Sequence, residues 1–198
     1  SMIDNPKVTD VLTEIIAPKL RLDISYCFVR TKGCPPLEMH GGQRGGRTNF
    51  RYDVHGDQIF TGLTVVSFAL QDISVEDGGF ACIPGSHKSD FGVPPEDQKL
   101  LYSIPGPLVR NIGAPKGSAL IFTETLAHGA ASWTADEPRY GVFYKYQDRT
   151  AMYHWREKIL PQPETLASLS KERQAYFNTP WEAFGPDGNP NNDLAEEY

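Results

Sequence analysis

The chain contains the H-x-D triplet His55-Gly56-Asp57 within the segment YDVHGDQIFTG. Such a triplet can supply a histidine and a carboxylate, two of the three protein ligands that hold iron(II) in many non-haem sites. However, the letters GDQ lie between the runs NFRYDV and IFTGLTVV, just upstream of Leu63, and are typical of a hairpin turn. A turn tip points to solvent, whereas a metal ligand must point into a cavity. The triplet therefore fits the chemistry by its letters but not by its position.

A second histidine, His40, lies in the glycine-rich segment EMHGGQRGGRTNF. The segment has neither the G-K-S/T ending of a phosphate-binding loop nor the G-x-G-x-x-G spacing of a dinucleotide site, which argues against a nucleotide cradle. Glycine-rich backbone beside a histidine suits a site that must admit a substrate. The alternative is a surface loop with an incidental histidine, and these residues alone leave both interpretations open.

The elements that would position these histidines are mostly short strands. A helix is predicted over about residues 8 to 17 with Thr9 as its candidate cap, and β-branched and aromatic runs then follow, interrupted by glycine and proline. These runs are GLTVVSFALQDI, GGFACIPGS, LVRNIG, SALIFTETLAHG and RYGVFYKYQ. They predict a mainly β fold, a sandwich or barrel, with flanking helices. One more helix is expected in PETLASLSKERQAYF, and an extended tail after it. We expect residues 1–160 to form the barrel with its N-terminal helix, and 161–198 to belong to the same domain.

Composition narrows the class of partner. The 198 residues are 39% hydrophobic and 22% charged with a net charge of −6, which fits one soluble domain and argues against nucleic-acid binding, because that needs a cationic surface. No apolar run approaches the ~20 residues that cross a bilayer, and no secretory leader is apparent, so a cytoplasmic location without membrane contact is expected. The cysteines, Cys27, Cys34 and Cys82, form no C-x-x-C pair, which indicates reduced thiols. A small-molecule substrate is the expected partner, and the sequence does not indicate an oligomeric state.

The segment DGGFACIPGSHK predicts a hairpin corner, with turns on both sides of a short strand and His87 at its edge. His87 is expected to be a corner residue bonded to backbone rather than a metal ligand. The string also resembles the N-G-x-L-x-x-x-P-G-S-H-K segment of the phytanoyl-CoA dioxygenase family. That family consists of Fe(II)/2-oxoglutarate-dependent oxygenases built on a double-stranded β-helix, a jelly-roll or cupin-like barrel. The later segments GSALIFTETLAHGAASW and DEPRYGVFYKY resemble the same family in the same order, so the resemblance spans roughly residues 8 to 150.

The resemblance implies roles for two of these residues. It gives His128 the part of the distal iron ligand and Arg139 the part of the arginine that binds the far carboxylate of 2-oxoglutarate. A guanidinium suits that carboxylate because it forms two parallel hydrogen bonds that lysine cannot reproduce. The spacing of eleven residues suggests neighbouring antiparallel strands with both side chains in one barrel mouth. The alternatives are a core histidine at His128 and a surface ion pair of Arg139 with Asp136 or Glu137.

The proximal half of the expected iron site departs from the usual family pattern. The segment LEMHGG is similar to that of a subgroup known by its HGG loop. This similarity favours His40 over His55 as the proximal histidine. Asp57 is then the less favoured candidate for the carboxylate ligand. Gly42 then occupies the aspartate position of H-x-D. Glu124 is the leading replacement, although regular strand rise would separate it from His128 by ~13 Å, so a bulge or bend is required. Otherwise the vacant position accepts water or halide, or iron binds weakly.

The resulting expectation is an iron(II) enzyme that uses 2-oxoglutarate and O2 to oxidise, by hydroxylation, a small organic substrate, releasing succinate and CO2. A halogenase and a non-catalytic barrel that binds a small molecule are the alternatives. Five aromatic residues are candidates for the walls of the substrate pocket, and His154 is expected to be peripheral. The candidate wall residues are Phe50, Tyr52, Phe60, Phe68 and Trp133.

Overall fold

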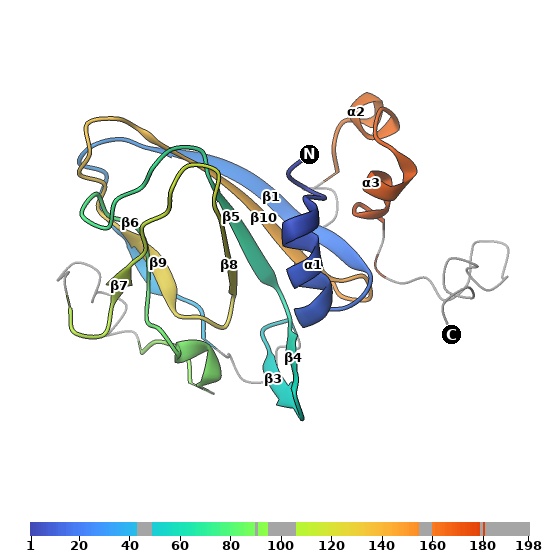
Figure 1. Ribbon diagram of the computed structural model, residues 1–198, viewed down its shortest axis with the longest axis horizontal. Coiled ribbons are helices and arrows are strands. Elements are labelled where there is room, and N and C mark those ends of the chain that lie inside the picture. The colour runs from blue at the N-terminus through green and yellow to red at the C-terminus, as the bar shows by residue number, and fades with distance from the viewer. Residues whose placement is uncertain (43–48, 90, 95–105, 155–159, 179, 181–198) are drawn as a thin grey trace, which may run out of the picture.

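Two antiparallel sheets form the body of the protein in the computed structural model, which describes residues 1–42, 49–89, 91–94, 106–154, 160–178 and 180 (Figure 1). The strands are β1 (Leu20–Arg30), β2 (Leu37–His40), β3 (Tyr52–His55), β4 (Gln58–Thr61), β5 (Thr64–Ala69), β6 (Gly79–Cys82), β7 (Arg110–Asn111), β8 (Ala119–Thr123), β9 (His128–Ala131) and β10 (Arg139–Asp148). One sheet has the order β1-β10-β5-β8, and the other has the order β2-β9-β6-β7. A separate hairpin joins β3 and β4.

Strands that lie side by side are mostly far apart in the sequence. Strand β10 pairs with β1 on one side and with β5 on the other, and β9 pairs with both β2 and β6. Connections that pass between two facing antiparallel sheets in this way are those of a jelly roll. The prediction of a mainly β, double-stranded β-helix fold is therefore confirmed.

Helix α1 (Pro6–Ile15) covers the outer face of the first sheet (Figure 1). It begins two residues before the predicted start, because the side chain of Asn5 accepts a hydrogen bond from the Lys7 amide at 3.1 Å and proline occupies the first turn. Thr9 is therefore not the cap. It lies within the helix rather than at its start, and its hydroxyl donates to the carbonyl of Asn5 at 3.2 Å.

The single helix expected after residue 160 is divided into α2 (Pro163–Ala167) and α3 (Lys171–Ala175). Ser170 interrupts the helical run, because its side chain accepts from the Arg173 amide at 3.4 Å and so caps a new helix. A short 3-10 helix, η1 (Ser86–Lys88), follows β6. The expected tail, GPDGNPNNDLAEEY at residues 185–198, lies outside the described part of the chain. None of the helices described is both long and apolar enough to span a bilayer.

Strand β5 is buried on both of its faces, and this explains its continuous apolar run. Alternate residues of a strand point to opposite faces. Val65 packs between the two sheets with Phe80 of β6, whereas Val66 packs on the outer face with Leu12 of α1. Since neither face meets water, the TVVSFA segment shows no polar alternation.

Candidate functional site

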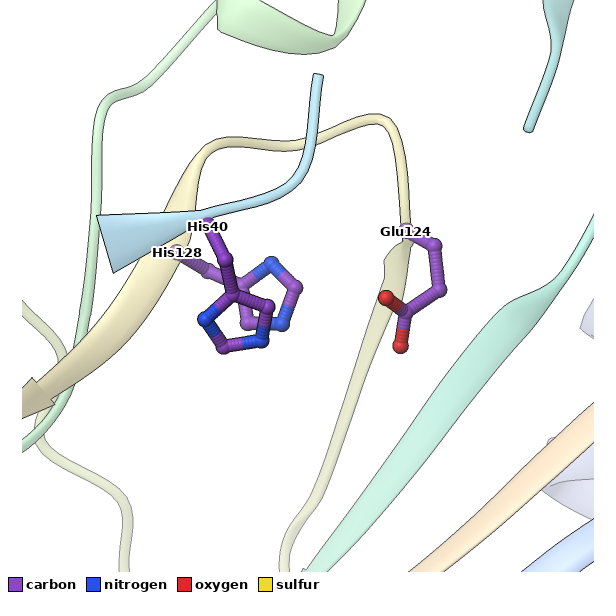
Figure 2. A group of neighbouring side chains, drawn as sticks. All are labelled: His40, Glu124 and His128. Atoms are coloured by element: carbon purple, nitrogen blue, oxygen red, sulfur yellow. The ribbon is translucent and has the colours of Figure 1, made fainter. Parts of the chain in front are cut away.

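Two histidines meet because of the register between β2 and β9. His40 is the last residue of β2 and His128 the first of β9, and the two are direct partners in the antiparallel ladder. Their ring centroids lie 4.2 Å apart with an interplanar angle of 55°. Figure 2 shows the two imidazoles side by side at this end of the sheet. His128 is buried, whereas His40 is exposed.

Backbone carbonyls fix the tautomer of both rings. Nδ1 of His128 lies 2.7 Å from the carbonyl oxygen of Leu126, and Nδ1 of His40 lies 3.0 Å from that of Glu38. A carbonyl can only accept, so each Nδ1 carries a proton and Nε2 is the nitrogen of each ring left to bind a metal. Burial, aided by the nearby His40, lowers the pKa of His128 to about 4, so this ring is neutral at pH 7. His128 therefore has the form that a metal ligand requires, and the Nδ1 bond of His40 leaves its Nε2 directed to the same use.

Glu124 joins the two histidines from the turn between β8 and β9. One ligand atom from each of His40, Glu124 and His128 lies within 4.8 Å of the others. Figure 2 shows the carboxylate on the connection that leads into the strand of His128, directed toward the rings. Glu124 lies in the turn after β8 and His128 begins β9, so the bulge or bend that the sequence required between them is a turn. The chain reverses between them, so the ~13 Å separation of a continuous strand does not arise.

Two glycines after His40 shape the backbone around this cluster. Gly41 has φ +100°, and a Cβ there would lie 2.2 Å from the carbonyl oxygen of Leu126 and 2.9 Å from that of Glu124. The absent side chain lets the end of β2 approach the turn that carries Glu124. Gly42, at the aspartate position of the H-x-D pattern, has φ +85°, and a Cβ would meet the Gly92 backbone at 2.7 Å. Position 42 thus carries no carboxylate in the sequence, and the neighbouring backbone leaves no space for one.

Lys145 compensates the charge of Glu124, although it was not among the residues predicted from the sequence. Its Nζ donates to Oε1 of Glu124, and the two side chains are 13% and 6% exposed. Burial alone would raise the pKa of Glu124, but Lys145 and His128 outweigh it, so the pKa lies below its ordinary value and the carboxylate is ionised. The signal for Lys145 was the alternation of β10, which puts it on the same face as Arg139 and Phe143.

Arg139 is a buried cation whose guanidinium has no acceptor among the described residues. The side chain is 3% exposed, and its Nε has no hydrogen-bond partner. Asp136, the ion-pair alternative, bonds instead to Lys32 at 2.6 Å. Burial and the neighbouring Arg30 lower the pKa of Arg139 to about 10, which still leaves it charged at pH 7. The ring of Phe28 lies 5.3 Å from its guanidinium carbon.

His40, Glu124, His128 and Arg139 all line one cavity of about 110 Å³ between the two sheets. The expectation that Arg139 and His128 lie on neighbouring strands is wrong, because β10 and β9 belong to different sheets and face each other. None of the five aromatic residues proposed as walls lines this cavity. The walls are Tyr26, Phe28, Leu37, Phe80, Phe122, Gly129, Ala130 and Phe143. Alternation along a strand does not reveal which of its faces is the inner one.

The H-x-D triplet stands apart from this cluster. His55 ends β3, and Gly56 and Asp57 form the two-residue loop to β4, with Gly56 at φ +65°. The predicted hairpin is confirmed. Both His55 and Asp57 are exposed, and neither lines the cavity.

The PGSHK corner supports the site through its serine. Ser86 Oγ accepts from the Ala127 amide at 2.8 Å and donates to the Ile83 carbonyl at 2.7 Å, which ties the corner to the turn between Glu124 and His128. His87 packs its ring against Tyr52, with centroids 4.5 Å apart, and no bond from this ring to backbone occurs in the described part of the chain.

His154 does not line the cavity, which agrees with its expected peripheral place, but it has a structural role. It is half-buried and bonds to the buried carboxylate of Asp23 through its ring Nδ1, and its backbone amide donates to the same carboxylate at 3.2 Å. Asp23 also accepts from the side chain of Gln147 at 2.7 Å and from the amide of Tyr153 at 2.8 Å. These bonds fasten the segment after β10 to β1.

Comparisons with known proteins agree with this fold. The sequence model of a family described as phytanoyl-CoA dioxygenase (PhyH) matches residues 43–141. The crystal structure of HygX from Streptomyces hygroscopicus with nickel, 2-oxoglutarate and hygromycin B bound is similar, with a TM-score of 0.66 and 24% identity. That similarity covers 75% of this chain and 64% of HygX, so the chain spans less than two thirds of that protein's length.

Two further solved structures share the fold at lower identity. The nickel complex of the non-haem monooxygenase ThoJ has a TM-score of 0.52 and 16% identity over 81% of this chain and 62% of its own. EvdMO1 has a TM-score of 0.55 and 12% identity over 74% of this chain and 32% of its own. No curated protein sequence matches this chain significantly.

Proposed function

The chain belongs to the phytanoyl-CoA dioxygenase family, and we propose that it is a non-haem iron(II) enzyme that oxidises a small organic substrate with 2-oxoglutarate and dioxygen. The observation that carries the proposal is the meeting of His40, Glu124 and His128 in a cavity that also contains Arg139, which has no acceptor in the described part of the chain. Iron bound at such a site supplies the oxidising power, by activating dioxygen as 2-oxoglutarate is decarboxylated to succinate and CO2.

The donor set supports iron as the metal. Two neutral imidazoles and one carboxylate are the ligands of the non-haem iron(II) oxygenases, and they leave the remaining metal positions open to other molecules. Each of the three side chains is prepared for this part: the carbonyls of Leu126 and Glu38 orient the rings, and Glu124 is ionised. HygX was crystallised with iron and, separately, with nickel and 2-oxoglutarate, which agrees with the same choice here.

The surroundings of Arg139 support 2-oxoglutarate as the cosubstrate. A buried guanidinium without a carboxylate partner is costly, and the far carboxylate of a dicarboxylic acid would satisfy it with two parallel hydrogen bonds. The cavity of about 110 Å³ suits a small diacid, because pockets for drug-sized ligands measure roughly 300–1,000 Å³. We therefore assign the organic substrate to the mouth of the cavity, where Tyr26, Leu37 and His40 are exposed.

The presence of Glu124 beside the two histidines favours hydroxylation over halogenation. A halogenase of this superfamily needs a ligand position that a halide can occupy in place of the carboxylate. Here a carboxylate reaches the histidines from another part of the chain, even though Gly42 lacks one. Substrate oxidation with oxygen transfer is accordingly the reaction that we propose.

An anaerobic titration with Fe(II) and 2-oxoglutarate tests the proposal. The parent protein should develop the metal-to-ligand charge-transfer band of iron-bound 2-oxoglutarate, and addition of dioxygen should release succinate and CO2. His40→Ala and His128→Ala should abolish the band, whereas His55→Ala, the matched control on the β3–β4 hairpin, should keep it. Loss of the band in His55→Ala with retention in His40→Ala would contradict the proposed ligand set. Absence of the band in the parent protein would refute the function itself.

A further inference from the structure

The ion pair between Lys145 and Glu124 places a cation beside the carboxylate of the proposed metal site. The inference drawn from this pair rests on that proposed site. We propose that Lys145 is a built-in counter-cation: it holds the Glu124 carboxylate in place when no metal is bound, and it competes with the metal for that carboxylate. Lys145 is thus a positioning residue that sets the metal affinity of the site, and we place it outside the set of metal ligands.

The position of Lys145 makes it a fixed part of the cavity wall. It lies near the middle of β10, opposite Ile24 of β1 on one side and Val65 of β5 on the other. Its Nζ also lies 5.8 Å from the centroid of the Tyr26 ring, an additional attraction for a cation. Since the side chain is only 13% exposed, its charge is held between two sheets and is not free to move into solvent.

The inner face of β10 carries two cations with different surroundings. Arg139 has no acceptor in the described part of the chain, whereas Lys145 donates to Glu124. Lys145 lies six positions after Arg139 in the strand, about 20 Å along the backbone at ~3.3 Å per residue. Arg139 is therefore available to an incoming anion, and Lys145 is already committed to a carboxylate of the protein.

The pair also decides how Glu124 can bind a metal. Lys145 engages Oε1, and in the described part of the chain no donor reaches Oε2. The carboxylate is thereby prepared to offer one oxygen rather than two. A carboxylate that binds through one oxygen leaves the most positions on the metal for a bidentate 2-oxo acid and dioxygen.

Whether metal affinity rises or falls when Lys145 is removed distinguishes a counter-cation from a residue that only packs the cavity wall. Removing one partner of a buried ion pair leaves the other as an uncompensated charge, which destabilises the protein. A bound dication neutralises that charge, and it no longer meets the repulsion of a nearby ammonium. Removal of the Lys145 ammonium should therefore lower the stability of the metal-free protein and raise its affinity for metal. A lysine that only packed the wall would, on removal, loosen the site and weaken metal binding.

The metal-free half of the inference is tested by thermal unfolding in excess chelator. Lys145→Met should lower Tm by roughly 5–10 °C, whereas the same change in a Glu124→Gln background should lower it by less than half as much. Lys116→Met, at an exposed turn, is the matched control and should leave Tm within about 1 °C. An equal loss in both backgrounds would overturn the counter-cation role. Lys145→Arg keeps the charge and should retain most of the Tm.

The metal half is tested by titrating the full chain with Mn(II) alone, which avoids oxidation in air. Lys145→Met should bind Mn(II) about tenfold more tightly than the parent, a change of about 1.4 kcal/mol. Lys145→Arg and Lys116→Met should bind it as the parent does. Unchanged or weaker binding by a folded Lys145→Met protein would overturn the inference. If the parent binds no metal, the proposed function and the competition with metal both fail, and the unfolding cycle alone decides whether Lys145 is the counter-ion of Glu124.

Discussion

Replacing Gly41 by alanine should damage the candidate metal site without touching any of its ligands. The new Cβ would lie 2.2 Å from the carbonyl oxygen of Leu126 and 2.9 Å from that of Glu124, both closer than van der Waals contact. The Leu126 carbonyl is also the acceptor for His128 Nδ1. Relief of the clash must therefore move the turn that carries one proposed ligand and orients another.

The magnitude follows from two terms that a control can separate. Alanine at a positive φ costs about 1–2 kcal/mol, and overpacking against backbone adds about 1–3 kcal/mol. Gly33→Ala is the matched control, because Gly33 has φ +81° and a Cβ there meets nothing within 4 Å. We expect Gly41→Ala to lose about 2–5 kcal/mol of unfolding free energy and Gly33→Ala only about 1–2 kcal/mol.

The decisive assay is metal affinity, measured by Mn(II) titration alongside urea unfolding. Displacing groups that orient metal ligands typically costs 10–100-fold in affinity, so Gly41→Ala should weaken Mn(II) binding by about that factor. Gly33→Ala should bind Mn(II) as the parent does. If the two variants lose equal stability and both keep parental Mn(II) affinity, the close approach of β2 to the β8–β9 turn does not shape the site.

Two further predictions concern Arg139 and Asp23. Arg139→Lys should raise the KM for 2-oxoglutarate by about 10-fold or more, since an ammonium cannot reproduce the paired hydrogen bonds. Its Mn(II) affinity should stay unchanged, and weakened Mn(II) binding would instead indicate a role at the metal. Asp23 is ionised despite its burial, because bonds from His154, Tyr153 and Gln147 outweigh the cost of burial and hold its pKa below the ordinary 3.8. A depressed folded-state pKa contributes stability that is present above pH 3.8 and is lost as the pH falls through the folded-state pKa. Asp23→Asn should therefore lower Tm at pH 7, and the difference from the parent should shrink below about pH 4. A constant difference across that range would contradict the assignment.

Local features of this fold could be predicted from the sequence because they depend on neighbouring residues. The hairpin at His55 to Gln58 follows from a glycine and an aspartate between two apolar runs, and the structure has it at that position. Because a turn tip points to solvent, the same local features disfavour His55 and Asp57 as metal ligands, whereas the preference for His40 rests on the family resemblance. Helix ends were less certain, because Asn5 and Thr9 are both capping residue types and only the backbone geometry selects Asn5.

The residues of the candidate site were named from the sequence and its family resemblance, but the geometry that brings them together could not be predicted, because it depends on which distant strands pair and in what register. His40 and His128 are 88 positions apart in the sequence and become partners only in the ladder of β2 with β9. Glu124 reaches them because the chain turns after β8, which is the bend that the sequence required but could not place. Lys145 was not predicted because alternation in β10 places it on the face of Arg139 but does not indicate that it pairs with Glu124, which lies 21 positions earlier.

The sequence by itself thus determined the fold class, the family resemblance and the residue types available for metal and cosubstrate binding. Only the tertiary structure decided that Glu124 stands beside the two histidines, that Arg139 has no carboxylate partner among the described residues, and that Lys145 pairs with Glu124. The physical reason is the range of the interactions. Turns and caps are fixed by hydrogen bonds within a few residues, whereas sheet order and register come from burial summed over both faces of many strands.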